Sequence, residues 1–304
     1  MSHGARLGWG GLELKSEFAR DYNSYSLHGS MPKVYYASMD GNQVEIDDSD
    51  LDLRANRALR TLYSGEFNVT ISRLSFSNAK IGGAVLSNLR ASQQSAMNNG
   101  YMNIVQKNSV GTILASSLKF NGAHFDFSLN HLEVNSLEQL SAAVQKVNQD
   151  VSLPPAQRGQ NLLAAIKEPG SVFLAHSPQF SLDRFSIASG DGEARLSGTV
   201  TLNGVAESDF QVGTDPKAII QKLQADLDMS IDDAFLSSLP SGAGVTAQLQ
   251  SFADQGLASH ANGKFHTKIA FHQGMTTFDG KSLPRPAAPP AAPPAVPRAP
   301  PARR

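Results

Sequence analysis

The sequence predicts a mainly β protein of the α+β class. We expect extended, repetitive antiparallel sheets with bulges, decorated by about four short amphipathic helices. Three observations lead to this prediction. One apolar spacing occurs three times, Asn-Gly and Asp-Gly dipeptides recur along the chain, and the stretches between these dipeptides alternate between apolar and polar residues. Such a combination is typical of long strands joined by tight turns.

The repeated spacing consists of two alternating apolar residues, a gap of two residues, and two more alternating apolar residues. Its three copies are Val69, Ile71, Leu74 and Phe76; Phe127, Leu129, Leu132 and Val134; and Phe180, Leu182, Phe185 and Ile187. These positions form no stripe on a helix. On a strand the extra residue would turn the second pair to the other face. We therefore predict β-bulges near Arg73, His131 and Arg184 that keep all four residues on the core side.

The turn dipeptides divide the chain into hairpins. Asp191-Gly192 separates two alternating runs, and we predict a hairpin from Phe180 to Leu202 with one face exposed to solvent. The predicted organisation is an N-terminal antiparallel β region over residues 1–135. A helix-decorated β region with a C-terminal strand-helix-strand module follows over residues 136–283.

The helices are predicted from apolar stripes and end signals. The first begins with a capping box formed by Ser136 and Gln139. The second helix follows Pro154-Pro155 and ends at Pro169-Gly170, and the third begins at Asp215-Pro216. The fourth contains Val245, Leu249 and Phe252 and ends at about Gly256. Each has one narrow apolar stripe and no basic polar face. We therefore expect packing on a sheet rather than on a membrane surface.

Residues 284–304 differ in composition from the rest of the chain. Proline and alanine dominate, with arginine at positions 285, 298, 303 and 304. Such a segment cannot bury a core, so we predict a disordered extension biased toward polyproline II. A spacer or solvated end is the simplest interpretation, because proline-ligand spacings are almost automatic in an alanine-proline tract.

The composition argues against several classes of function. The chain has 304 residues, a formal net charge of −1 and no cysteine. The balanced charge gives no electrostatic footprint for nucleic acid, and the absence of cysteine excludes disulfides and thiolate metal sites. No apolar stretch reaches the roughly 18 residues that a spanning helix needs, and the first residues do not resemble a secretory signal. We expect no nucleic-acid partner and no transmembrane segment.

No catalytic, metal-binding or cofactor-binding motif is evident. His266 and His272 share a strand face but are separated by roughly 20 Å at about 3.3 Å per residue, too far to hold one ion. The acidic run at residues 47–52 resembles a calcium loop, but Leu53 stands where the loop needs glycine, so a solvated strand edge is the simpler interpretation. A G-x-S-x-G elbow and a Walker loop are absent. We expect neither an enzyme nor a cofactor.

The C-terminal part resembles a known family. An alternating strand at Ala225–Ile231, a short helix at Asp232–Leu236, a strand at Phe265–Phe271 and the closing segment Phe278–Pro284 resemble the C-terminal module of the YdgA-like family. Its members are bacterial envelope proteins of unknown function. Asp279 stands where the family usually has asparagine in its closing hairpin, and both residues tolerate positive φ there.

The resemblance covers roughly residues 10 to 284, and its motifs are structural. It implies a periplasmic or cell-envelope location, for which the chain itself carries no visible signal or anchor. YdgA-like proteins begin with a hydrophobic signal or anchor and a further β region. The resemblance therefore implies that this chain corresponds to the later part of such a protein, through truncation or a downstream start.

Two non-catalytic functions stay open, and an enzyme is the least favoured third alternative because no catalytic constellation is visible. One is a non-catalytic cell-envelope β-scaffold that binds a lipid or amphiphile along an apolar sheet face, by analogy with other bulge-rich envelope proteins. The other is a structural, self-associating or protein-interaction module without a small ligand, whose partner is another envelope protein or a second copy in a homo-oligomer. Four phenylalanines would line an apolar groove or otherwise form a closed core: Phe125, Phe127, Phe180 and Phe185.

Overall fold

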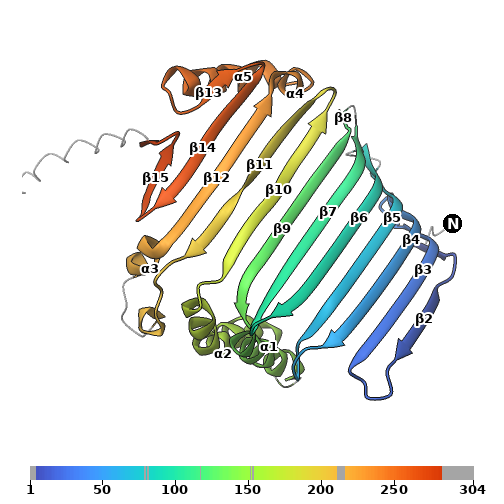
Figure 1. Ribbon diagram of the computed structural model, residues 1–304. Coiled ribbons are helices and arrows are strands. Elements are labelled where there is room, and N and C mark those ends of the chain that lie inside the picture. Colours follow the sequence, from blue (N-terminus) through green and yellow to red (C-terminus); the bar gives the residue numbers. More distant parts are fainter. Residues whose placement is uncertain are drawn as a thin grey trace, which may run out of the picture.

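The strands form one large curved sheet. The computed structural model describes residues 5–78, 80, 82–116, 118–150, 152, 154–210 and 216–282. Within these residues all strand pairs are antiparallel, and the sheet order follows the chain order as β1-β3-β4-β5-β6-β7-β9-β10-β11-β12-β14-β15-β16 (Figure 1). The short strands β2, β8 and β13 pair with β3, β7 and β14. The prediction of a mainly β protein with antiparallel strands is confirmed.

The sixteen strands are up to 17 residues long. Those that precede the first helix are β1 (Arg6–Trp9), β2 (Glu13–Phe18), β3 (Ser24–Ala37), β4 (Asn42–Arg57), β5 (Tyr63–Asn78), β6 (Gly82–Asn98), β7 (Tyr101–Ala115), β8 (Leu118–Phe120) and β9 (Gly122–Glu133). Those that follow are β10 (Gln179–Ser189), β11 (Gly192–Leu202), β12 (Leu223–Asp232), β13 (Ser259–Ala261), β14 (Lys264–His272), β15 (Met275–Phe278) and β16 (Lys281–Ser282).

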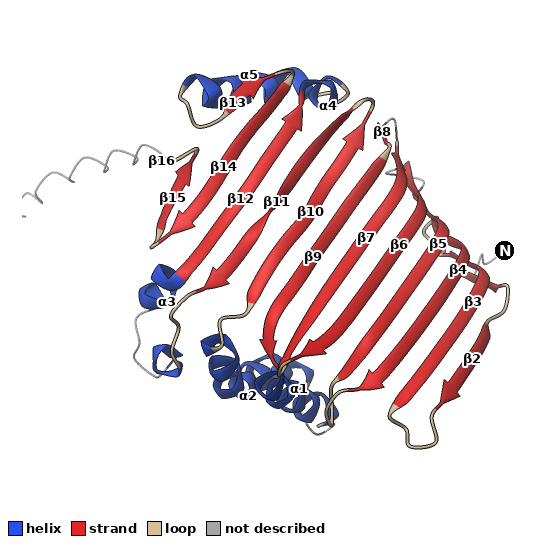
Figure 2. Ribbon diagram, in the orientation of Figure 1, coloured by secondary structure: helices blue, strands red, loops and turns tan. Residues whose placement is uncertain are grey.

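Five α-helices accompany the sheet in the described residues, and they lie at the two ends of the strands (Figure 2). They are α1 (Val134–Gln149), α2 (Pro155–Ala175), α3 (Pro216–Lys222), α4 (Asp233–Ser237) and α5 (Gly242–Asp254), with a 3₁₀ turn at Glu207–Phe210. Four of them occupy the four expected places. The fifth, α4, is the short helix that the family resemblance implied.

Several of the tight turns use the predicted dipeptides, whereas the turn between β10 and β11 is formed by Gly190 and Asp191 rather than by Asp191-Gly192. Asn99 and Gly100 connect β6 to β7 with φ angles of 49° and 80°. Asn262 and Gly263 connect β13 to β14 in the same way, with φ of 54° and 72°. A two-residue turn with positive φ at both positions matches the right-handed twist of the strands that it joins. The predicted hairpin is also present, because β10 pairs with β11 along its length.

Two of the three predicted bulges are present. The register between β7 and β9 shifts near His131, which has a φ of 60°, and the register of β10 against both of its neighbours shifts at Arg184. The bulge predicted at Arg73 is wrong, because β5 keeps a constant register there. The irregularity lies instead in the neighbouring strands, where Asp48 and Asn88 have positive φ opposite Ser72.

The helix ends differ from the sequence-based prediction in two places. The capping box is wrong, because α1 begins at Val134 and its N-cap is Glu133, whose carboxylate accepts from the backbone N–H groups of Asn135 and Ser136 at 3.2 and 2.6 Å. The end of α2 at Pro169 is also wrong, and the helix continues to Ala175. The last turn brings Phe173 against the cluster of Met102, Leu132 and Val134, and this packing favours continuation past the proline.

Buried apolar residues are few in the described part of the chain, and seven of the twelve form two small clusters at opposite ends of the strands. One cluster contains Phe235, Leu236, Leu249 and Phe265, and joins α4 and α5 to β14. The other is the Met102 cluster beside α1 and α2. A sheet with one apolar face normally buries that face against a second layer. Among the described residues, the second layer is present only at the ends of the strands (Figure 2).

The remaining predictions concern the boundary between the two β regions, the acidic run and the C-terminal tail. The sheet continues across the boundary between residues 135 and 136, because β9 pairs with β10. The acidic run at residues 47–52 is not at a sheet edge, since β4 pairs with both β3 and β5. The tail at residues 284–304 and the start of the third helix at Asp215 lie outside the described residues.

Candidate functional site: the concave apolar face

One face of the sheet is apolar across most of its width. Residues directly opposite one another in antiparallel strands point to the same face. One such row crosses eight strands and consists of Ile71, Leu89, Val110, Ala123, Ile187, Ala194, Ile231 and Phe265. The strand pairing therefore joins apolar residues from distant parts of the sequence into one continuous surface.

The opposite face carries polar and charged side chains. His266 contacts Asp228 at 3.0 Å, and His272 contacts Asp226 at 2.9 Å, in each case between β14 and β12. These two histidines share a face as expected, but each has its own carboxylate partner. Among the described residues no group of three or more potential metal ligands is present. The polar face is therefore a solvated surface laced with side-chain pairs.

The helices cover the two ends of the apolar face and leave its middle uncovered. Ile187, Ala194 and Ile231 pack against the cluster formed with α4 and α5. Ile104 and Leu129 pack against the cluster beside α1 and α2. Within the part of the chain that the structure describes, the strand segments between these clusters have no second layer above them. The uncovered middle is thus the part of the face that is available to a ligand.

The four predicted phenylalanines lie together in this uncovered middle. The ring centroids are 5.4 Å apart for Phe125 and Phe127, 6.2 Å for Phe125 and Phe185, and 6.0 Å for Phe127 and Phe180. Phe125 is 45% exposed and Phe185 is 50% exposed. The structure therefore brings the four side chains into one series of ring contacts, and the rings of Phe125 and Phe185 are not part of a closed core.

The bulge in β10 places Phe185 on this face. Arg184, next to it, lies on the polar face, where its guanidinium donates to the Glu193 carboxylate at 2.6 Å and to the Ser186 hydroxyl at 2.9 Å. Burial raises the pKa of Glu193, but the hydrogen bonds from Arg184 and Ser186 and the positive charge outweigh it, so the pKa lies below its usual range. Pairing of Arg184 across the hairpin thus holds Phe185 on the apolar side.

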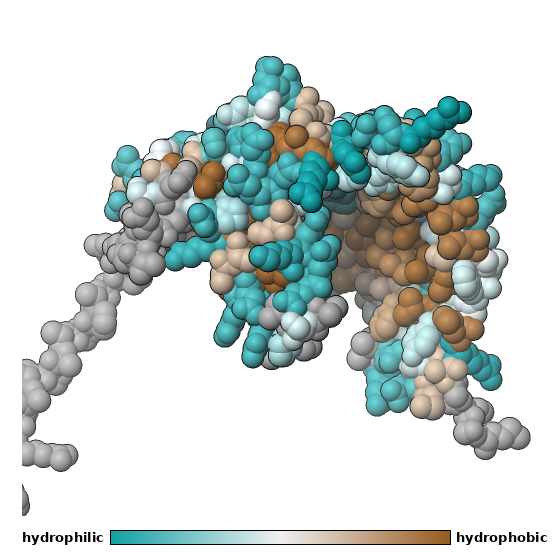
Figure 3. All heavy atoms as spheres, turned by 90° about the horizontal axis from the view of Figure 1, so that it is seen from below, coloured by the Kyte–Doolittle hydropathy of each residue, from teal (hydrophilic) through white to brown (hydrophobic). Residues whose placement is uncertain are grey.

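A cavity of about 390 Å³ occupies the middle of the sheet. It is lined by residues of β5, β6, β7, β9 and β10, including Val69, Ile71, Phe125 and Phe185. Seen along the strands, apolar residues line a hollow beneath a hydrophilic outer surface (Figure 3). We call the apolar side of the sheet, which includes this hollow, the concave apolar face.

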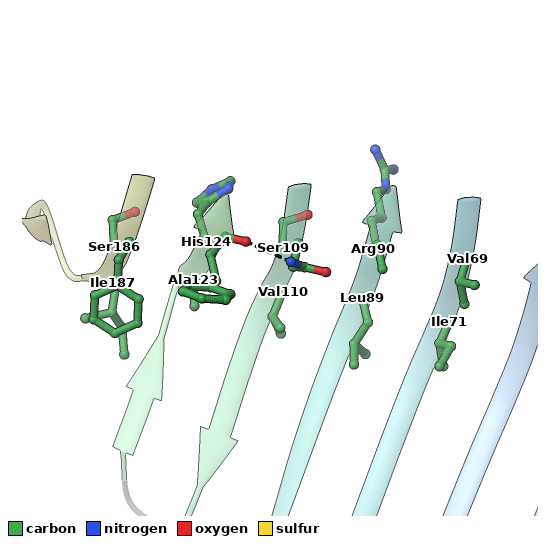
Figure 4. Close-up of a pocket in the computed structure, with 14 residues that line it drawn as sticks. Val69, Ile71, Leu89, Arg90, Ser109, Val110, Ala123, His124, Ser186 and Ile187 are labelled. Carbon is green, nitrogen blue, oxygen red and sulfur yellow. Dashed lines mark hydrogen bonds between the residues drawn. The ribbon is translucent and has the colours of Figure 1, made fainter. Parts of the chain in front are cut away.

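The close-up shows how the two faces separate at the cavity (Figure 4). Leu89, Val110 and Ile187 extend from one side of the sheet, whereas Arg90 and His124 extend from the opposite side. Residues of both sets border the cavity because they are neighbours along the same strands, where successive side chains point to opposite faces. The charged groups therefore do not point into the apolar hollow.

Amide side chains interrupt the apolar face on β6 and β7. Gln93 lies directly opposite Gln106, and Gln106 in turn lies opposite Phe127. The Gln106 amide donates to the Asn108 side-chain oxygen at 2.9 Å, and Asn108 donates to the Phe125 carbonyl oxygen at 2.8 Å. This group supplies uncharged hydrogen-bonding atoms beside the phenylalanines.

Comparison with known proteins gives one result. Residues 1–286 match the model of a family described as a bacterial protein of unknown function, DUF945. The chain belongs to this family. No curated protein and no solved structure matches the chain significantly. The DUF945 match supports a bacterial protein of unknown function, whereas the narrower YdgA-like assignment and the interpretation as the later part of a longer protein stay predictions.

In the described part of this DUF945 protein, no helix is both long enough and apolar enough to cross a membrane.

Sequence reasoning named the phenylalanines but missed part of the cavity lining. Leu89, Val110 and Ala123 line the cavity and were not singled out. Phe127 and Phe180 were singled out, yet they stack beside the cavity rather than line it. The signal that identifies the missed residues is the strand register, because only the register shows which positions on separate strands share a row.

Proposed function

We propose that this protein is a non-catalytic scaffold that binds a lipid or another amphiphile with its apolar chain along the concave apolar face. The observation that carries the proposal is the uncovered cavity of about 390 Å³, lined by Phe125 and Phe185 in their half-exposed state. Small-molecule sites are typically hollows of this size with mostly apolar walls and few polar groups.

The energetics favour an apolar occupant. Complete burial of a phenylalanine side chain contributes roughly 1.5–3 kcal/mol, so covering two half-exposed rings contributes about 1 kcal/mol each. The neighbouring apolar row adds further area, and large uncovered apolar patches usually mark interaction sites. The amides of Gln106 and Asn108 offer hydrogen bonds to ester or hydroxyl groups without requiring a charged ligand.

The proposal is tested by purifying the protein without detergent and extracting it with organic solvent. We expect mass spectrometry to find an amphiphile at a level comparable to the protein. We also expect saturable binding of a dansyl-labelled undecanoic acid, with increased fluorescence in the apolar hollow. Protein that carries no amphiphile and shows no saturable binding of this probe would contradict the proposal.

Two adjacent substitutions give a matched control. Val69 lines the cavity, whereas the next residue, Thr70, is exposed on the polar face. Both lie in the middle of β5, so Val69→Asp and Thr70→Asp place the same carboxylate in the same strand. We expect Val69→Asp to abolish probe binding and Thr70→Asp to preserve it. Equal loss in both variants would point to a general effect on β5 and against the cavity.

We also propose that this role is carried out in the cell envelope. The support is the resemblance of the C-terminal strands and short helix to YdgA-like envelope proteins. Fractionation of the bacterium that makes the protein, followed by immunodetection, tests this location. Detection in the cytoplasmic fraction alone would contradict it.

A further inference from the structure

Strand β2 presents an unpaired edge at the N-terminal side of the sheet. In the part of the chain that the structure describes, β2 pairs with β3 alone, over Glu13 to Phe18. Every residue of β2 is exposed. The outer backbone N–H and C=O groups of such a strand are a template for pairing with another strand.

The two faces of β2 differ in the same way as the two faces of the sheet. Leu14 lies opposite Gly29, in a row that continues to Leu51 and Val69, and Phe18 stacks on Tyr25 with centroids 6.0 Å apart. Both are therefore on the concave apolar face, where they are 57% and 62% exposed. Proteins usually protect an edge strand with charges or prolines. Strand β2 carries its charges on the polar face alone, and on the other face apolar side chains reach the edge itself.

The other face of β2 carries charges of alternating sign. Lys15 contacts Glu13 at 2.9 Å, and both side chains are well exposed. Glu17 has no cationic partner among the described residues. One free carboxylate and one solvent-exposed ammonium group thus lie two residues apart on the open strand.

We propose that two copies of this chain associate through β2, paired antiparallel about a two-fold axis that passes Ser16. This register places Lys15 of each copy opposite Glu17 of the other, on the polar face. On the apolar face it places Leu14 opposite Phe18 and Ser16 opposite itself. Slipping the register by two residues toward the N-terminus would place Lys15 opposite Lys15, so charge complementarity selects the first arrangement.

The two-fold axis is perpendicular to the sheet, so the concave apolar faces of the two copies join into one continuous surface. The interface is an isologous one with a single short strand from each copy. It therefore forms a weak, reversible dimer rather than an obligate one.

Charge reversal tests the register. Sedimentation velocity over a range of concentrations measures the dimer dissociation constant of the full chain. Lys15→Glu alone and Glu17→Lys alone each place like charges opposite one another at two positions, and we expect each to weaken dimerisation by about 10- to 100-fold. The double variant Lys15→Glu/Glu17→Lys restores both pairs, so we expect dimerisation close to that of the unaltered protein.

Mixing the two single variants gives a second readout. In the mixture, the glutamates at positions 15 and 17 of one chain face lysines at positions 17 and 15 of the other, so we expect heterodimers where neither variant forms homodimers. Since the chain has no cysteine, Ser16→Cys should form a disulfide-linked dimer under mild oxidation, whereas Ser72→Cys, in the middle of the sheet, should not.

Three outcomes would overturn the proposal. The first is a monomer at every concentration at which the protein remains soluble. The second is a dimer that is indifferent to these charges, which would place the interface elsewhere or on a partner's strand. The third is equal cross-linking at Ser16→Cys and Ser72→Cys. Circular dichroism of each variant separates loss of association from loss of folding. Amphiphile binding to a single copy is measured separately, so failure of either proposal leaves the other intact.

Discussion

Phe125 on β9 and Phe185 on β10 meet edge to face, with ring centroids 6.2 Å apart and an interplanar angle of 83°. About half of each side chain remains exposed. An aromatic pair in this geometry usually closes a core, yet here it forms the floor of an open hollow. The Phe125–Phe185 pair therefore contributes both to the pairing of β9 with β10 and to the candidate binding surface.

Removing these rings should cost less stability than truncating a buried phenylalanine. We expect Phe125→Ala and Phe185→Ala each to lower the free energy of unfolding by about 1–2 kcal/mol, compared with about 3–5 kcal/mol for buried rings. The double variant should reveal a coupling of about 0.5–1.5 kcal/mol. Urea unfolding measures all three. Losses of buried-ring size would show that the hollow is closed in solution.

Leu236 should be far more sensitive, because it is 2% exposed in the cluster that α4 and α5 form with β14. We expect Leu236→Ala to lower the free energy of unfolding by about 2–5 kcal/mol. Leu236→Met conserves volume and should cost less than about 1.5 kcal/mol. The same urea titration compares the two, and similar costs would argue against tight packing around this side chain.

Two glycines in α5 form a matched pair. A Cβ atom at Gly242 would lie 1.7 Å from the Leu236 carbonyl oxygen, whereas a Cβ at Gly244 meets no atom within 4 Å. We expect Gly242→Ala to destabilise the protein by about 1–3 kcal/mol through backbone displacement. Gly244→Ala should be neutral or stabilising by up to about 1 kcal/mol, because alanine favours a helix. Thermal unfolding of both variants checks the difference, and equal effects would contradict the close approach.

Glu133 should make the stability of the protein depend on pH. Burial raises the pKa of its carboxyl group, but hydrogen bonds from Ser136 and Asn135 outweigh it and the pKa lies below its usual range. Because the pKa is lower in the folded state, the charged carboxylate stabilises the protein at pH values above the unfolded pKa of about 4.3. This stabilisation is lost as the pH falls through the folded pKa. We expect Glu133→Ala to cost about 1 kcal/mol at neutral pH.

The pH series provides the check on this prediction. The difference in unfolding free energy between the unaltered protein and Glu133→Ala should shrink below about pH 4. Glu66→Ala, at an exposed carboxylate on β5, serves as the control for general effects of charge. A difference that stays constant across this range would indicate that the carboxylate does not cap α1 in its charged form.

Much of the fold could be predicted from the sequence because its signals are local. Alternation identifies strands over a few residues, and Asn99-Gly100 specifies its own turn through positive φ. The bulges at His131 and Arg184 followed from the apolar spacing. At Arg73 the same spacing misled, because the irregularity lies in β4 and β6, at Asp48 and Asn88 opposite Ser72. The sequence of one strand does not show where the neighbouring strands have an irregular backbone.

Helix ends were predicted less well, and the reason is tertiary. Pro169 should end α2 on local grounds, but packing of Phe173 against the Met102 cluster carries the helix past it. Likewise, Ser136 and Gln139 match a capping box, yet α1 already begins at Val134, and the carboxylate of Glu133 accepts from the backbone N–H groups of Asn135 and Ser136. Contacts worth a kilocalorie or two decide such boundaries.

The sequence by itself determined the strands, the turns and an apolar side for each strand, because side-chain alternation and turn conformation act between residues close in the chain. Only the tertiary structure decided that these strands form one sheet and that Phe125 meets Phe185. It also decided that helices cover the ends of the apolar face and leave the middle open. Those features depend on register and on where α1, α2, α4 and α5 pack. Both are set by contacts between distant residues.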